Sequence, residues 1–240
     1  MSSWTLKSIP PHDWFICLDI NPYFDHEHEP EKMFEDGFTR PIPLAERDII
    51  ATTFFNGDPE NPEFHIETPE DLSKEEISQA NKTLARIFGT NLDLRPLYDQ
   101  AENDPVLGPH LREYYGLKRM ARGTLLEDII YRIVQMQLSH KPTAKKMAFK
   151  MREAYGTHLT HEGKTLPAWP RPWQLAKANP AEIRKMGPTL RKGEYMVGLA
   201  QDMLAGEVNL EYLDKEADPQ EFYDKISKVR GIGPTSAQDL

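Results

Sequence analysis

Residues 226–237 hold the pattern in this sequence that is most closely tied to chemistry. Gly231 and Gly233 flank one aliphatic residue, between the end of one expected helix and the start of another. This spacing allows a tight turn whose backbone N–H groups point outward, and such groups bind phosphate oxygens. Lys228 and Arg230 add positive charge beside the turn. Two glycines at this spacing also occur at ordinary helix ends, so the pattern alone remains compatible with a plain C-cap.

The elements that must position this turn are mostly helices. Ser73 and Glu76 form a capping box, and Gly89 ends the helix that the box opens. Thr124 opens the most apolar helix, whose apolar positions recur at helical spacing as far as Leu138. Further helices are expected to begin at Asp104, Thr143, Asn179, Pro188 and Asp218, with stops at Gly156, Gly187, Gly206 and Gly231.

The first 70 residues differ from the rest, because they are rich in proline and in short β-prone runs. These runs cover residues 14–20, 38–44 and 49–55. We therefore predict an α+β protein, with a small antiparallel sheet domain and one or two helices in residues 1–90. An all-helical domain is expected to follow in residues 91–240.

Charge is distributed unevenly along the chain. The net charge is −9, which by itself argues against nucleic acid as a partner. Residues 1–110, however, hold 8 basic and 22 acidic residues, whereas residues 111–240 hold 21 basic and 16 acidic ones. Only the second part is therefore suited to face a polyanion, although a random distribution of surface charge remains an alternative.

Several motifs in a fixed order resemble one protein family. Residues 231–237 resemble the hairpin signature of the helix-hairpin-helix superfamily of DNA base-excision glycosylases, and most closely its 3-methyladenine glycosylase II branch. The other matching segments are residues 10–14, 37–40, 135–139, 166–170, 186–187, 191–192, 199–200 and 206–210. The resemblance thus extends over nearly the whole chain.

The resemblance implies a monofunctional N-glycosylase for base-excision DNA repair. Its partner would be duplex DNA with a damaged, alkylated base, which is flipped out of the stack into a cleft between the two parts. The resemblance also implies a monomer with no membrane association and no required cofactor, with a monovalent cation as a candidate occupant of the hairpin. A bacterial protein of this family would be cytoplasmic and nucleoid-associated, and a eukaryotic one nuclear. A DNA-binding module without catalysis is the alternative, because the same hairpin serves elsewhere only to grip the backbone.

The family pattern also assigns residues to roles. Gln137 and Leu138 are candidates for the side chain that fills the gap in the base stack, but Leu138 could equally be the last core residue of its helix. Ser139 could touch DNA or cap the next segment. The expected DNA contacts are Lys228, Arg230, Gly231, Gly233, Thr235, Ser236, Gln137, Leu138 and Ser139. The expected base pocket is formed by Ile20, Thr235 and Asp239.

Two departures from the family pattern concern the chemistry. Family members that also cleave the backbone carry a lysine nucleophile where this chain has Thr235, so no Schiff base is expected. Alkylation-repair members often carry aromatic residues where this chain has Thr235 and Asp239, and this departure puts alkylpurine specificity in question. The family's catalytic aspartate follows the hairpin in a later loop, and this sequence ends at Leu240. We therefore expect the chain to be a fragment without that aspartate, inactive as it stands.

Other residue patterns have plainer explanations. Residues 25–29 alternate acidic residues with histidines and could bind a metal, but a solvated acidic loop explains them better, because alternation in a loop fixes no ligand geometry. His158 and His161 are expected in a loop, and Trp169 and Trp173 are expected to pack under a proline-rich connection. The single cysteine, Cys17, excludes an internal disulfide and a four-cysteine metal site within this sequence.

Overall fold

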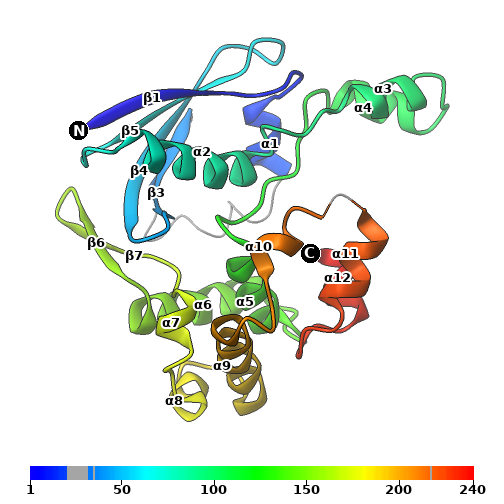
Figure 1. Ribbon diagram of the computed structural model, residues 1–240. Helices are drawn as coiled ribbons and strands as arrows, with labels where there is room; N and C mark the ends of the chain where they lie inside the picture. The colour runs from blue at the N-terminus through cyan, green and yellow to red at the C-terminus, as the bar shows by residue number, and fades with distance from the viewer. Residues whose placement is uncertain (21–31, 35, 217) are drawn as a thin grey trace. The chain divides into compact units, whose positions relative to one another are not determined.

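The computed structural model describes residues 1–20, 32–34, 36–216 and 218–240. The chain divides into two compact units. The first comprises Met1–Gly123 and Leu159–Leu166, and the second comprises Thr124–His158 and Pro167–Leu240. The expected boundary after residue 90 thus falls inside the first unit, which also includes the helices α3 and α4 (Figure 1).

The first unit contains a five-stranded antiparallel sheet in the order β1-β5-β4-β3-β2. Its strands are β1 (Ser2–Lys7), β2 (Lys32–Phe34), β3 (Gly37–Pro43), β4 (Asp48–Asn56) and β5 (Glu63–Thr68). Its helices are α1 (Trp14–Ile20), α2 (Lys74–Phe88), α3 (Arg95–Ala101) and α4 (Leu107–Glu113). The α+β class is confirmed, and β3 and β4 confirm two of the expected strands.

The core of the first unit is aromatic. Phe64 of β5 stacks on Phe88 of α2 with ring centroids 4.3 Å apart, and Trp14 of α1 meets both rings edge-on. All three side chains are fully buried. Burial of each side chain stabilises the folded state by about 1.5–3 kcal/mol. Through these ring contacts the aromatic cluster packs α1 and α2 against the sheet.

The prediction of a strand at residues 14–20 was wrong, because this segment forms α1. Asp13 accepts hydrogen bonds from the N–H groups of Ile16 and Cys17, through its side chain and its carbonyl respectively. Trp14 and Cys17 are buried on one side of the helix. The segment is rich in β-prone residue types, but burial of Trp14 and Cys17 in the tertiary structure overrode their strand propensity.

The second unit is helical. Its helices are α5 (Leu125–Gln135), α6 (Lys141–Tyr155), α7 (Pro172–Leu175), α8 (Pro180–Lys185), α9 (Leu190–Ala205), α10 (Leu210–Leu213), α11 (Pro219–Ile226) and α12 (Pro234–Asp239). A two-stranded sheet, β6 (His158–His161) and β7 (Lys164–Pro167), interrupts it in sequence. The apolar core of this unit includes buried side chains of α5 and α9. Val229 and Ile232, which belong to the hairpin, are part of the same core.

Helix caps account for where most of the helices begin and end. The Ser73–Glu76 box opens α2, and Gly89 ends it with φ = 66°, as expected. Thr124 caps α5 by accepting from the N–H of Glu127. Gly206 ends α9 in the left-handed conformation, and Asp218 caps α11.

Several expected helix boundaries were displaced. The first turn of α6 begins before Thr143, at Lys141, because a proline follows there and its fixed φ suits a first turn. Thr189 rather than Pro188 caps α9. Asp104 precedes the first residue of α4, Leu107, but its carboxylate accepts from the N–H groups of Val106 and Leu107, so it caps the turn that leads into this helix.

Two other helices, α5 and α11, end earlier than expected. α5 ends at Gln135 rather than Leu138, and α11 ends at Ile226 rather than Gly231. After α11 the chain forms short i to i−3 hydrogen bonds, such as that from the N–H of Val229 to the carbonyl of Ile226. These tight turns replace the last helical turns. Among the described residues, no helix combines the length and apolar character that crossing a bilayer would require.

Candidate nucleic-acid interface

The predicted hairpin is a turn between α11 and α12 in the second unit, drawn in red in Figure 1. Val229 and Ile232 are buried and anchor the turn in the apolar core. The N–H of Ile232 donates to the carbonyl of Val229 at 3.0 Å. Gly231 adopts φ = 95°, which a residue with a side chain rarely adopts. The chain therefore reverses direction at Gly231 while its apolar neighbours point inward.

The two glycines of the hairpin have different roles. A Cβ on Gly231 would lie 2.7 Å from ring carbons of Tyr195 in α9, so a side chain does not fit there. A Cβ on Gly233 would meet no heavy atom within 4 Å. Gly231 is needed for the turn itself, whereas Gly233 leaves an open surface that a ligand can approach closely.

Backbone donors are available at this open surface. The carbonyl of Gly233 accepts from the N–H of Ala237, the hydrogen bond that starts α12. Within the described part of the chain, the N–H groups of Gly231 and Gly233 have no recorded acceptor. Exposed N–H groups of this kind bind anions such as phosphate.

Positive side chains surround the turn. Lys228 and Arg230 are exposed, and the guanidinium of Arg230 lies over the ring of Tyr195, with its Cζ 5.7 Å from the ring centroid. The guanidinium of Arg191, at the start of α9, lies over the same ring at 5.5 Å. The hairpin thus combines free backbone donors with cations.

The second predicted contact segment follows α5. Gln137 is exposed and adopts φ = 61°, the left-handed conformation that is costly for a residue with a side chain. Leu138 is half-buried against the apolar core. Ser139 is exposed, and the residue at the cap position of α6 is His140 rather than Ser139. Gln137 and Ser139 are thus both exposed, and of the three residues Gln137 is the one with a positive φ.

A buried lysine holds this turn in place, and sequence reasoning gave it no role. The ammonium of Lys192 donates to the carbonyl of Val134 at 2.9 Å and to that of Met136 at 2.5 Å. These are among the last carbonyls of α5, where a positive charge is favourable. Burial lowers the pKa of Lys192. Its spacing of 56 residues from Met136 explains why no local signal revealed the contact.

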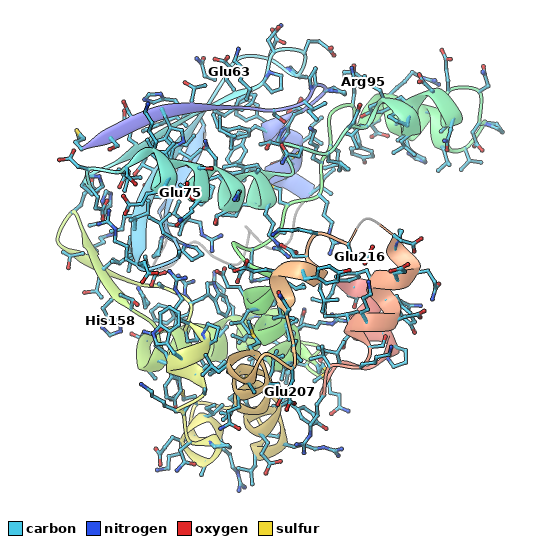
Figure 2. All side chains as sticks on the ribbon, in the orientation of Figure 1. Glu63, Glu75, Arg95, His158, Glu207 and Glu216 are labelled. Atoms are coloured by element: carbon cyan, nitrogen blue, oxygen red, sulfur yellow. The ribbon has the colours of Figure 1, made fainter. Side chains whose placement is uncertain are left out.

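The other sequence-based candidates lie apart from this surface or carry no ligand geometry. His158 and His161 are on β6, not in a loop as expected, and His158 hydrogen-bonds to a backbone carbonyl (Figure 2). Trp169 is buried as expected, whereas Trp173 is 44% exposed, contrary to expectation. Residues 25–29 lie outside the described residues. Within the described ranges, no group of three or more His, Cys, Asp or Glu side chains could hold a metal ion.

Comparisons with known proteins agree with this geometry. No family model matches the chain. The chain is 30% identical over 170 residues to "DNA-3-methyladenine glycosylase" of Bacillus subtilis strain 168, covering 70% of this chain and 54% of that protein. Its fold matches a 3-methyladenine DNA glycosylase from Archaeoglobus fulgidus with a TM-score of 0.77 at 22% identity, covering 98% of this chain and 77% of the other. In sequence and in fold, the chain is therefore similar to 3-methyladenine DNA glycosylases.

A second fold match is the 8-oxoguanine glycosylase/lyase of Clostridium acetobutylicum. The TM-score is 0.69 at 17% identity, and the alignment covers 99% of this chain and 75% of the other. The chain spans between 54% and 60% of the curated relatives that it matches. These solved structures share less than a quarter of their residues with this chain and show its fold alone.

The predicted base-pocket residues are found in both units. Ile20 lies at the end of α1 in the first unit and is 43% exposed. Thr235 and Asp239 lie on α12, where Thr235 is exposed. Asp239 forms an ion pair with Arg132 of α5, so its charge already has a partner. Ser236, an expected DNA contact, is buried beside these residues and 5% exposed. The combination of the three residues into one pocket remains a prediction.

Proposed function

We propose that this protein acts in base-excision repair as a monofunctional DNA N-glycosylase, removing a damaged, alkylated base from duplex DNA by base flipping. The proposal is supported by its 30% identity to a curated 3-methyladenine glycosylase. A structure with the same fold, from Clostridium acetobutylicum, was solved "in complex with dsDNA containing cytosine opposite to 8-oxoG". Duplex DNA is accordingly the proposed partner.

One observation carries the proposal most strongly, namely the open surface at Gly233. This glycine has free space above it, backbone donors without recorded acceptors, and the exposed cations Lys228 and Arg230 beside it. A DNA phosphate needs close backbone approach, N–H donors and positive charge. The hairpin offers all three on one turn.

The residues of this chain then bind and orient the DNA. The hairpin grips the backbone of one strand, and the exposed Gln137 occupies the space that the flipped nucleotide leaves in the stack. N-glycosidic bond cleavage passes through a cationic sugar, which a carboxylate stabilises. Thr235 has a hydroxyl instead of an amine and cannot form a Schiff base, so the reaction would stop at base release without strand cleavage.

Binding can be tested with one pair of variants. Gly233→Gln places a side chain over the proposed phosphate site, whereas Gly198→Gln adds the same side chain on α9, where a Cβ would likewise meet nothing within 4 Å. We expect Gly233→Gln to weaken duplex binding at least tenfold in fluorescence anisotropy, with no change for Gly198→Gln. Equal affinities for both variants and the unaltered protein would exclude the hairpin as the contact.

Catalysis needs a separate test, because a non-catalytic DNA-binding module is the second candidate. Duplexes carrying an alkylated, deaminated or oxidised base are incubated with a version of the protein that spans the full length of the curated relatives, and the released base is measured by chromatography. Release from one of them, without strand cleavage before alkali treatment, is expected for a monofunctional glycosylase. Tight binding with no release from any duplex would instead favour the binding module.

A further inference from the structure

We propose that Arg191 and Arg230, assembled on the ring of Tyr195, form a second phosphate-binding subsite beside the hairpin. The subsite would hold two neighbouring phosphates, one at each guanidinium, of the same DNA strand that the hairpin N–H groups contact. The inference rests on the proposed DNA binding, and it adds Arg191 and Tyr195 to the expected contacts.

The three side chains come from two separate segments of the second unit. Arg191 and Tyr195 are one turn apart on α9, and Arg230 follows α11. Both guanidinium Cζ atoms lie within 6 Å of the ring centroid, at 5.5 Å for Arg191 and 5.7 Å for Arg230. Tyr195 itself packs against the apolar core and against Gly231. The ring is therefore a fixed platform on which the two cations are gathered next to the turn.

The charges of this cluster lack the partners that other cations in the unit have. Arg132 pairs with Asp239, and Lys225 pairs with Glu221 and with Glu216, which Figure 2 labels. In contrast, no carboxylate of the described residues lies within 4 Å of the guanidinium of Arg191 or Arg230. Cation–π contacts with one ring stabilise each guanidinium by only about 0.5–1 kcal/mol at an exposed site. An anion bound at the two guanidinium groups would offset the repulsion between their like charges.

The chemistry of the site favours a phosphodiester over a single carboxylate. Guanidinium groups bind phosphate oxygens through paired N–H donors in a planar fork. Gly233 with its open surface and the exposed cation of Lys228 are part of the same turn. A single carboxylate would satisfy one cation, whereas a DNA strand supplies phosphates in series along the whole surface.

The test is the salt dependence of binding to an undamaged duplex, measured by fluorescence anisotropy between low and physiological potassium chloride. Each lost phosphate contact lowers the slope of log Kd against log salt by about 0.9. We therefore expect R191Q and R230Q each to lower the slope by about one, and the double variant by about two. R112Q, which removes an exposed arginine of α4 in the first unit, is the matched control and should leave the slope unchanged.

The ring itself is tested with Y195F and Y195L. Y195F keeps the platform and should bind like the unaltered protein, whereas Y195L keeps all charges but removes the ring and should weaken binding several-fold. Thermal melting of each variant establishes that it is folded under the assay conditions. Slopes of R191Q and R230Q equal to that of R112Q would overturn the subsite while leaving the proposed function standing. No duplex binding by the unaltered protein at low salt would overturn the proposed function itself.

Discussion

Each unit of the molecule contains a buried lysine that donates to backbone carbonyls, and the two lysines have different consequences. Lys118, in the first unit, is 1% exposed and donates to the carbonyl of Ile9 at 2.6 Å and to the hydroxyl of Ser8 at 3.2 Å. Lys192, in the second unit, is 9% exposed and donates to the last carbonyls of α5. Burial lowers the pKa of both, to about 8 for Lys118.

The difference lies in what each lysine holds in place. Around Lys118 the polar groups are themselves buried: Nδ1 of His12 lies 2.8 Å from the Ser8 hydroxyl, and the thiol of Cys17 accepts from the N–H of Lys118. This network ties the chain after β1 to residues more than a hundred positions later. Lys192 instead supports the exposed turn at Gln137. A strongly perturbed pKa therefore does not by itself indicate a functional site. The better indication is that the titratable side chain supports a segment that is exposed.

The largest expected effect is acid destabilisation confined to the first unit. Burial and the nearby Lys118 charge lower the pKa of His12 from its usual 6.5 to about 3. Because the unfolded chain binds this proton more readily, stability should fall by several kcal/mol as pH drops from about 6.5 toward 3. Hydrogen exchange monitored by mass spectrometry should show β1 and β5 losing protection before α9. His12→Asn, which cannot titrate, should flatten this pH dependence; an unchanged profile would contradict the role of His12.

Replacing the buried lysines should separate stability from binding. Lys118→Met removes the hydrogen bonds from the ammonium to the carbonyl of Ile9 and to the hydroxyl of Ser8, each worth about 1–3 kcal/mol, although losing a buried charge offsets part of this. We expect a lower melting temperature for the first unit with unchanged DNA affinity. A loss of DNA affinity in the folded Lys118→Met variant would contradict the expectation that Lys118 affects stability alone.

Lys192→Met should lower DNA affinity about tenfold even at temperatures where the protein stays folded, because the turn at Gln137 loses its support. That factor corresponds to about 1.4 kcal/mol. Lys192→Arg keeps a cation near the α5 carbonyls and should restore part of the affinity. If Lys192→Met binds duplex as well as Lys118→Met does, the turn is not part of the interface.

The smallest expected effect concerns the side chain of Gln137, in the turn after α5. Gln137→Gly and Gln137→Ala both remove the side chain, but only glycine relieves the left-handed backbone, a gain of about 1 kcal/mol. Both variants should bind duplex more weakly, and only Gln137→Gly should melt at a higher temperature. Chemical denaturation and anisotropy on the same samples provide the comparison. Unaltered binding in both would leave Gln137 without a role in DNA contact.

Local sequence signals were reliable where the interacting atoms are close in sequence. The capping box at Ser73 and the stop at Gly89 predicted α2 in detail, since these hydrogen bonds join residues within four or five positions. The same reasoning failed for α1, where burial of Trp14 and Cys17 on one side decided the conformation. It also missed β6 and β7, because alternation over four residues is too short to recognise.

The candidate interface likewise has some features that the sequence indicated and others that depend on contacts between distant residues. The glycine pair and the adjacent Lys228 and Arg230 were evident from residue types and spacing, whereas the turn after α5 was indicated by the family resemblance alone. Nothing in the sequence distinguished the packed Gly231 from the open Gly233, because the difference depends on Tyr195, which lies 36 positions away.

The sequence by itself determined the superfamily pattern, the α+β class and the helix ends that caps control, because these depend on neighbouring residues. Only the tertiary structure decided that Lys192 holds the α5 turn and that two arginines share the ring of Tyr195. Those contacts join segments 35 to 58 residues apart, and their energy appears only after the apolar core has brought the helices together.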